Sequence, residues 1–306
     1  MKPSVAITIR SFNQSDQAMK KLKDEFEIVY INTTDRHLSE KDLISALKNA
    51  EYVVAGTELF SKKVLEESPN LKVISRVGIG TDNIDINTAK KFKIRILNTL
   101  ETPGLAVAEH TLALLFAVLK KIPQYNTKMR NGDYSIEPGI MLSGKNIGIV
   151  GLGRIGYRVS TMLSALGAYI NYYDPYLKNK FFIEWKSFES LEELVSSVEI
   201  VSLHIPAQIN QSAIFNDMIF KQCKKGIILI NTARGSLIDE KALICSLDTG
   251  IVSAAGLDVF SKEPYSGELL KYYQVIVTPH IASNTIESRK KMELEAVNNM
   301  INTFRI

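Results

Sequence analysis

Short runs of β-branched and apolar residues alternate with helical patterns of apolar positions along the whole chain. This alternation is typical of parallel sheets that carry helices on both faces. One series of strand candidates fills the first hundred residues and a second runs from 146 to 278, which predicts two α/β domains. The predicted strands are Val5–Ile9, Ile28–Ile31, Tyr52–Ala55, Lys72–Ser75 and Ile94–Leu97, then Asn146–Val150, Tyr169–Tyr173, Ile200–His204, Ile227–Asn231, Ser253–Leu257 and Val275–Thr278.

Three helical segments carry further information. Ser39–Lys48 begins with Ser39 and Asp42, which form a plausible capping box. Ala106–Lys121 is apolar on most faces, so we expect it to be buried between the domains or in an oligomer interface. On that ground we expect a homodimer held largely by this helix. The segment 285–304 predicts one amphipathic helix.

Composition excludes several classes of protein. The 306 residues are 45% hydrophobic and 23% charged, which is not the composition of a disordered or fibrous chain. The net charge of +4 is spread without basic blocks, which argues against a nucleic-acid partner and allows at most small acidic ligands. Two cysteines are too few for a disulfide framework, and no Cys/His cluster has the spacing of a metal site.

No targeting or membrane segment is expected. The N-terminus lacks a signal-peptide core. The longest apolar run, Leu112–Leu119, is far shorter than the ~18 residues that a membrane span needs. We therefore expect a cytoplasmic protein with no membrane partner.

A glycine motif follows the predicted strand Asn146–Val150 directly, in the order Gly151-Leu152-Gly153-Arg154-Ile155-Gly156. Gly151 permits the tight turn, Gly153 lets the backbone approach a pyrophosphate, and Gly156 lets the helix pack closely on its strand. Backbone N–H groups and the helix dipole make this loop an anion site. The motif predicts a dinucleotide-binding domain.

The next predicted strand ends at Asp174, 18 residues after Gly156. A carboxylate there accepts hydrogen bonds from the adenosine ribose hydroxyls and repels a 2′-phosphate, so NAD is favoured over NADP. The alternative is an Asp that starts a turn before Pro175. Lys178, close to the strand end, leaves NADP open.

Polar residues also follow the later strands of the second series, where open α/β sheets bind ligands. They include Arg234, Asp258, Glu263 and His280. Four histidines are available as a proton shuttle near neutral pH, and they are His37, His110, His204 and His280. His280 is the catalytic candidate, whereas we expect His37 in a solvated turn, His110 in a structural role and His204 lining the cofactor cleft.

Five segments together resemble the D-isomer-specific 2-hydroxyacid dehydrogenase family. They are Val150–Gly156, Asn231–Gly235, Leu257–Phe260 with Glu263-Pro264, Thr278–Ile281 and the candidate substrate loop Arg76–Asp85. The resemblance covers nearly the whole chain and implies two doubly wound parallel-sheet domains. A Rossmann NAD domain at 101–284 would be inserted into a flavodoxin-like substrate domain built from 1–100 and 285–306.

The resemblance also implies catalytic roles. His280 would give a proton to the substrate carbonyl oxygen during reduction, and Glu263 would orient its ring and favour its protonated form. Arg234 would bind the substrate carboxylate and polarise the carbonyl. Backbone N–H groups around Val77 and Gly78 would hold the far side of that carboxylate.

The remaining implied contacts are to NAD. Asp258 would bind the nicotinamide carboxamide. The other cofactor-binding candidates are Gly151, Gly153, Arg154, Ile155, Gly156, Asp174, His204, Pro206, Thr232 and Ala233.

The substrate depends on Arg76. If its side chain enters the cleft, a second cation beside Arg234 suits a small acid with two anionic ends, and 3-phosphoglycerate becomes the first candidate, with a role in serine biosynthesis. If Arg76 is only a surface residue that ends a strand, glyoxylate or hydroxypyruvate remains. The chain ends after one helix, so we expect no regulatory domain. A related class, the NAD-sensing corepressors, retains the same catalytic residues and stays as an alternative.

Overall fold

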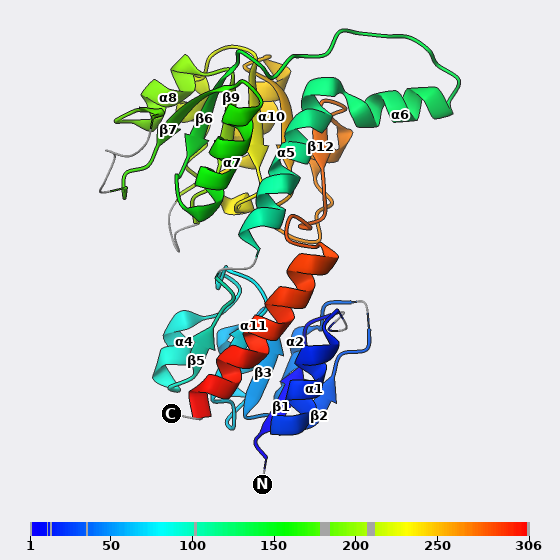
Figure 1. The fold of residues 1–306 in the computed structure, drawn as a ribbon, viewed down its shortest axis with the longest axis vertical. Coiled ribbons are helices and arrows are strands. Elements are labelled where there is room, and N and C mark those ends of the chain that lie inside the picture. The colour runs from blue at the N-terminus through cyan, green and yellow to red at the C-terminus, as the bar shows by residue number, and fades with distance from the viewer. Residues whose placement is uncertain are drawn as a thin grey trace. The chain divides into compact units, whose positions relative to one another are not determined.

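The structure is a computed structural model that describes residues 2–10, 12, 14–34, 36–100, 103–177, 184–206 and 212–304. It divides into two compact units, Met1–Pro103 with Ser283–Ile306, and Gly104–Ala282 (Figure 1). The second unit is therefore inserted into the first along the chain. The division falls at Gly104, where a helix begins, and at Ala282, rather than at the expected positions 101 and 284.

The first unit is built on a five-stranded parallel sheet with the order β2-β1-β3-β4-β5. Its strands are β1 (Ser4–Ile7), β2 (Glu27–Ile31), β3 (Tyr52–Ala55), β4 (Val73–Arg76) and β5 (Arg95–Leu97). Its helices are α1 (Asp16–Glu25), α2 (Glu40–Leu47), α3 (Lys62–Glu66), α4 (Ile86–Lys91) and α11 (Ile286–Phe304). This order is the flavodoxin-like arrangement and confirms the predicted fold of the unit.

Helices cover both faces of this sheet because successive side chains of each strand point to opposite sides. In β1, Val5 and Ile7 join a core with α1 and α11, whereas Ala6 between them joins the core formed with α2 and α3. Helix α11, the last of the chain, packs beside α1 and over β4 (Figure 1). Ser39 caps α2 and its hydroxyl donates to the Asp42 carboxylate, as the capping spacing predicts.

The second unit is built on a seven-stranded parallel sheet with the order β12-β11-β10-β9-β6-β7-β8. The strands are β6 (Asn146–Val150), β7 (Tyr169–Tyr173), β8 (Lys186–Ser187), β9 (Ile200–Leu203), β10 (Ile227–Asn231), β11 (Val252–Leu257) and β12 (Val275–Val277). The helices are α5 (Gly104–Lys120), α6 (Ile122–Arg130), α7 (Arg154–Ala165), α8 (Leu191–Ser197), α9 (Asp217–Gln222) and α10 (Glu240–Asp248), with 3₁₀ turns at Gly235–Leu237 and Glu268–Lys271. Counted from β6, the order 3-2-1-4-5-6-7 is that of a Rossmann sheet.

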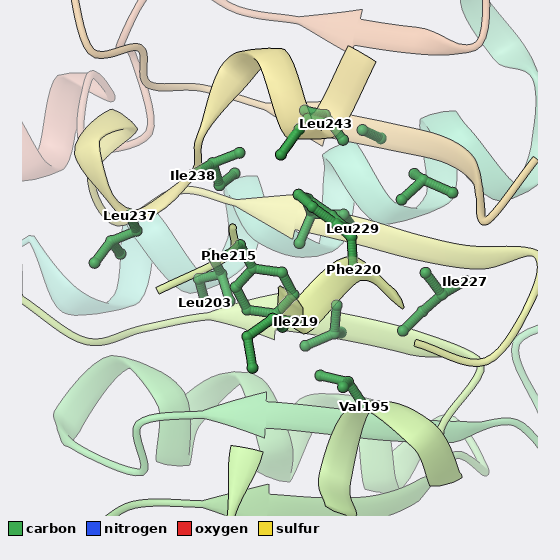
Figure 2. Packing of buried hydrophobic residues seen from close by; sticks show 14 of the residues in the cluster. Val195, Leu203, Phe215, Ile219, Phe220, Ile227, Leu229, Leu237, Ile238 and Leu243 are labelled. Atoms are coloured by element: carbon green, nitrogen blue, oxygen red, sulfur yellow. The ribbon is translucent and has the colours of Figure 1, made fainter. Parts of the chain in front are cut away.

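Two cores flank this sheet. On one face Ile228 and Ile230 of β10 pack with α5 and α7. On the other face Leu229 and Leu203 pack against Phe215, Phe220 of α9 and Leu243 of α10, as Figure 2 shows. The alternation along β10 explains why this strand is an unbroken apolar run in the sequence.

Helix α5 covers most of its apolar surface within its own unit. Leu115 and Leu119 are buried in the core shared with Val159 of α7, and α5 also packs on β10, β11 and β12. Leu115 and Leu119 are therefore buried without contact to the first unit or to a partner chain. Among the described residues, no helix is both long and apolar enough to span a membrane.

Every strand predicted from the sequence is present, with ends shifted by at most two residues. The two-residue strand β8 is absent from the sequence prediction. Such a short strand has no periodic pattern of its own and exists because Asn171 and Tyr172 of β7 offer an open edge.

Candidate active site

The glycine loop between β6 and α7 has the geometry that the motif predicts. Gly151 has φ +92°, and a Cβ there would lie 2.9 Å from the carbonyl carbon and oxygen of His204. A Cβ on Gly156 would overlap the Gly151 carbonyl oxygen, so any side chain would push the helix from its strand. Gly153 faces open space, and as the N-cap of α7 it supplies no side-chain cap. The loop thus leaves room for an anion at a helix N-terminus.

Asp174, directly after β7, holds the same loop. One carboxylate oxygen accepts from the Leu152 N–H at 2.8 Å and the other from the Tyr176 N–H at 2.9 Å. Asp174 therefore starts the turn before Pro175 and also lies against the glycine loop. Its contact with ribose remains a prediction, and Lys178 lies outside the described residues.

His204 follows β9 beside this loop. Its Nε2 and the Ser202 hydroxyl are 2.9 Å apart, and burial lowers the pKa of His204 to about 3. The ring is therefore neutral at physiological pH and cannot serve as a proton shuttle there. Pro206, two residues on, is exposed.

The segment after β10 is fixed by Asn231, a fully buried residue that sequence reasoning did not single out. Its side-chain amide donates to the Arg234 carbonyl oxygen at 2.8 Å and its carbonyl accepts from the Ala233 N–H at 3.0 Å. Arg234 adds a bond from Nη1 to the Ala233 carbonyl oxygen at 2.6 Å. Thr232, also on this segment, bonds to Thr111 of α5 at 2.8 Å between their hydroxyls.

The Arg234 segment packs against the segment that follows β11. A Cβ on Gly235 would overlap the carbonyl carbon of Phe260. The two backbones therefore touch, and only glycine fits. This contact links the segment of Arg234 to that of Glu263, three residues after Phe260.

Glu263 and His280 form a hydrogen-bonded pair. Glu263 Oε2 lies 2.8 Å from His280 Nδ1, and Glu263 Oε1 accepts from the Phe260 N–H at 3.0 Å. Burial alone would raise the pKa of Glu263, but the bonds from His280 and Phe260 outweigh it and lower that pKa below 4.5. The carboxylate is charged at neutral pH and orients the ring.

The backbone around His280 is held by Asp258. His280 has φ +55°, a left-handed conformation, and its N–H donates to the Asp258 carbonyl oxygen at 2.8 Å. The Asp258 carboxylate accepts from the Thr278 hydroxyl at 2.6 Å and from the N–H groups of Ile281 and Ala282, both at 2.9 Å. Asp258 therefore anchors the backbone on both sides of His280.

Asp258 also faces helix α5. His110 Nε2 lies 3.4 Å from the carboxylate and 3.1 Å from the Thr278 hydroxyl. Burial would raise the pKa of Asp258, yet the bonds from His110, Thr278 and the backbone lower it. The carboxylate is fully buried, so its contact with the nicotinamide carboxamide stays a prediction while its hold on the His280 segment is observed.

All of these segments leave parallel strands at their carboxyl ends, so they lie along one edge of the seven-stranded sheet. The edge combines a helix N-terminus, an arginine, and a carboxylate–imidazole pair. That set can bind an anion and move a proton. Within the part of the chain that the structure describes, no group of three or more His, Cys, Asp and Glu side chains is placed to hold a metal ion.

The candidate substrate loop of the first unit needs a correction. The Val77 N–H donates to the Ala55 carbonyl oxygen at 2.8 Å, and the Gly78 N–H donates to the Thr99 hydroxyl at 2.8 Å. Neither is available to a substrate carboxylate as predicted. Among the described residues of this loop, the N–H groups of Ile79 and Gly80, next along the chain, have no acceptor and can therefore bind an anion.

Arg76 is not the exposed surface residue of the alternative interpretation, because it is only 8% exposed. Its Nε donates to Asn83 Oδ1 at 3.3 Å. Its Nη1 occupies the place where a Cβ on Gly78 would stand, so the guanidinium lies against the glycine. Arg76 is thus fixed beside the loop that carries the free N–H groups.

The chain matches a family model described as D-isomer specific 2-hydroxyacid dehydrogenase, NAD binding domain, over residues 112–282. That is more than half of the chain. The match covers the glycine loop, Arg234, Glu263 and His280, and it confirms the resemblance seen in the sequence.

Individual relatives agree with this match. A D-3-phosphoglycerate dehydrogenase of Mycobacterium bovis is 34% identical over 275 residues, which are 88% of this chain and 51% of that protein. A glyoxylate reductase of Thermofilum pendens is 34% identical over 302 residues, 94% of this chain and 88% of that protein. The crystal structure of TT0316 protein from Thermus thermophilus is similar with a TM-score of 0.87 and 30% identity, covering 100% of this chain and 97% of that one. The chain spans about half the length of the phosphoglycerate dehydrogenases that it matches.

Proposed function

Because the chain belongs to the D-isomer specific 2-hydroxyacid dehydrogenase family, we propose that it interconverts a D-2-hydroxyacid and its 2-oxoacid with NAD(H). The observation that carries the proposal is the 2.8 Å contact of Glu263 with His280, on the same sheet edge as Arg234 and the glycine loop. NAD(H), when bound, supplies or accepts the hydride. The residues of the chain supply binding, orientation and the proton.

His280 is the acid and base of this proposal. Its Nδ1 is engaged by Glu263, so Nε2 is the atom that gives a proton to the carbonyl oxygen in reduction and takes it back in oxidation. The charged Glu263 stabilises the imidazolium that forms in the oxidative direction. Asp258 keeps the backbone of His280 in its left-handed conformation, so the ring is preoriented.

Arg234 binds the substrate carboxylate and polarises the neighbouring carbonyl, a task for which its planar fork is suited. Within the first unit, the N–H groups of Ile79 and Gly80 replace those of Val77 and Gly78 as the candidates for binding a substrate anion. In this proposal residues 101–284 bind the cofactor and residues 1–100 with 285–306 bind the substrate.

The cofactor contacts follow from the loop geometry. The N-terminus of α7, with Arg154 and Ile155, faces the pyrophosphate, and Asp174 receives the ribose hydroxyls. His204, Pro206, Thr232 and Ala233 lie on the segments that follow β9 and β10 at the same edge. We propose NAD rather than NADP because the Asp174 carboxylate repels a 2′-phosphate.

For the substrate we propose 3-phosphoglycerate, and with it a role in serine biosynthesis. Arg76 lies beside the loop with the free N–H groups and would be a second cation for a phosphate. The phosphoglycerate dehydrogenases among the relatives support this choice.

Glyoxylate or hydroxypyruvate is the second candidate, and one observation favours it. Arg76 is 8% exposed and a buried carboxylate, Glu58, acts on it electrostatically, so its charge is partly offset. The relative with the greater coverage is a glyoxylate reductase.

We also propose a homodimer, with a different surface from the one that the sequence suggests. Helix α6 has no buried residue, and residues 131–141 are exposed throughout, with Tyr134, Ile136 and Met141 at 77%, 87% and 68%. This segment is nevertheless fixed to α5 at Ile140. The Ile140 N–H donates to the Leu119 carbonyl oxygen at 2.8 Å, and the Ile140 carbonyl oxygen accepts from Lys120 Nζ at 2.9 Å. Exposed apolar side chains on an ordered segment are typical of a surface that contacts a second copy of the same chain.

A panel of 2-oxoacids with NADH tests the function. We expect saturable oxidation of NADH with phosphohydroxypyruvate, hydroxypyruvate or glyoxylate. Tight NADH binding with no turnover of any 2-oxoacid would contradict the enzyme and favour an NAD-sensing protein.

A further inference from the structure

Glu58 is a buried carboxylate beside the candidate substrate loop that the reaction proposed above does not use. It is 3% exposed, and its Oε2 accepts from the Gly56 N–H at 2.6 Å. Gly56 directly follows β3, and Arg76 ends the neighbouring strand β4, where it pairs in register with Ala55. Glu58 and Arg76 therefore leave adjacent strands at the same edge of the sheet.

Asn83 ties the two residues together. Its carbonyl oxygen accepts from Arg76 Nε at 3.3 Å, and its amide donates to the Glu58 backbone carbonyl at 2.6 Å and to that of Gly56 at 3.3 Å. The Arg76 guanidinium lies against Gly78 at its other end. The Arg76 side chain is thus positioned between Gly78 and Asn83, and Asn83 is in turn bonded to the turn that carries Glu58.

The charges of Glu58 and Arg76 act on each other in a poorly solvated region. Burial raises the pKa of Glu58, while the N–H groups of Glu58 and Gly56 and the Arg76 guanidinium oppose that rise. Charges that are buried in this way are screened far less than surface charges. A negative charge at Glu58 lowers the positive potential that Arg76 presents to a ligand.

We infer that Glu58 is a specificity-determining residue, whose carboxylate offsets Arg76 and weakens the selection of substrates that carry a second anionic end. The inference rests on the proposed function, in which Arg76 lies at the substrate site. Its consequence is that a 2-oxoacid with a neutral far end is accepted beside a phosphorylated one. The residue acts through Arg76 and need not touch the substrate.

The test compares two acids that differ only in a phosphate, phosphohydroxypyruvate and hydroxypyruvate, with NADH as the reductant. Glu58→Gln removes the charge but keeps a carbonyl oxygen for the Gly56 N–H. We expect it to raise the ratio of kcat/KM for the phosphorylated over the unphosphorylated acid by about tenfold. The increase in this ratio should come from a lower KM for phosphohydroxypyruvate.

Two controls separate charge from general disturbance. Glu40→Gln removes an exposed carboxylate of the same unit, one that pairs with Lys63 at 3.2 Å, and should leave the ratio unchanged. In an Arg76→Met background, Glu58→Gln should change the ratio by less than about twofold, since the partner charge is gone. An unchanged ratio in Glu58→Gln, or an equal rise without Arg76, overturns the inference.

If the wild type reduces no 2-oxoacid, the proposed function fails. The interaction of Glu58 with Arg76 can then still be tested by a double-mutant cycle in which Tm is measured. If Glu58 and Arg76 interact, the change of Tm in the double variant differs from the sum of the two single changes. Additive changes would overturn the pairing whatever the activity.

Discussion

The Glu263 carboxylate and the His280 imidazole lie 2.8 Å apart, although they belong to segments that follow different strands of the sheet. Each partner has a further anchor on the segment that follows β11, since Glu263 accepts from the Phe260 N–H and the His280 N–H donates to the Asp258 carbonyl oxygen. Because both segments start from adjacent strands, β11 and β12, the sheet itself sets their separation. The sheet therefore holds the pair in the arrangement that the proposed proton transfer requires.

Replacing His280 tests the proton shuttle. We expect His280→Ala to lower kcat by about 10²–10⁴-fold, the usual contribution of a general acid and base. NADH affinity should stay within a few-fold, since the glycine loop is untouched. His37→Ala, which removes the exposed histidine near Thr57, is the control, and near-normal turnover in His280→Ala would place the shuttle elsewhere.

Glu263→Gln tests the orienting charge. The pKa of Glu263 is lowered in the folded protein, so its contribution to stability is present above pH 4.5 and is lost as the pH falls through the folded pKa. The wild type should therefore have a higher Tm than Glu263→Gln at pH 7, and the difference should shrink toward pH 3. Turnover should survive with a shifted pH optimum. A Tm difference that is the same at pH 7 and pH 3 contradicts the assigned charge.

Asp174 tests the choice of cofactor. Its carboxylate lies at the end of β7 against the Leu152 N–H, so we expect NADH to bind more tightly than NADPH. Asp174→Asn removes the charge but keeps an acceptor for the Leu152 N–H. We expect it to reduce the ratio of NADH affinity to NADPH affinity by about tenfold. Fluorescence titration of both cofactors measures this. Equal or tighter binding of NADPH by the wild type would be incompatible with the role of Asp174.

The exposed segment 131–141 tests the dimer. Ile136→Asp places a charge at a position that is 87% exposed in the single chain, so it should leave the fold intact and shift a dimer to monomer. Met218→Asp, at a 71% exposed position on α9, is the matched control. Sedimentation of the wild type as a monomer at micromolar concentration would remove the proposal.

The elements of the fold and the residues at the strand ends could be predicted from the sequence because both are local signals. β10 is an apolar run with Asn231 at its end, and the glycine motif follows β6 without a gap. Parallel pairing then brings such strand ends to one edge, so the proximity of Glu263 and His280 follows once the sheet order is known.

Properties that depend on contacts distant in the sequence could not be predicted. The N–H groups of Val77 and Gly78 are occupied by Ala55 and Thr99, and neither partner is visible from the loop itself. The contacts of α5 with β10, β11 and β12 of its own unit are not visible from the apolar pattern of the helix, and its role in an oligomer interface stays a prediction. The link between Glu58 and Arg76 runs through Asn83 and depends on the register of β3 and β4.

Arg76 tests the substrate. The guanidinium is held beside Gly78, so a phosphate bound next to it would gain a charge-assisted contact that glyoxylate cannot make. We expect Arg76→Ala to lower kcat/KM for phosphohydroxypyruvate by about tenfold or more and to affect glyoxylate far less.

Truncating a buried arginine also disturbs packing around Asn83, and such damage lowers kcat/KM for both acids. The ratio of the loss for phosphohydroxypyruvate to the loss for glyoxylate therefore decides between the substrates. Arg76→Lys keeps a charge but loses the fork, so it should recover part of the phosphorylated activity. If glyoxylate is the better substrate of the wild type, or Arg76→Ala lowers both activities alike, 3-phosphoglycerate is wrong, and a 2-oxoacid with one carboxylate is the substrate of this site.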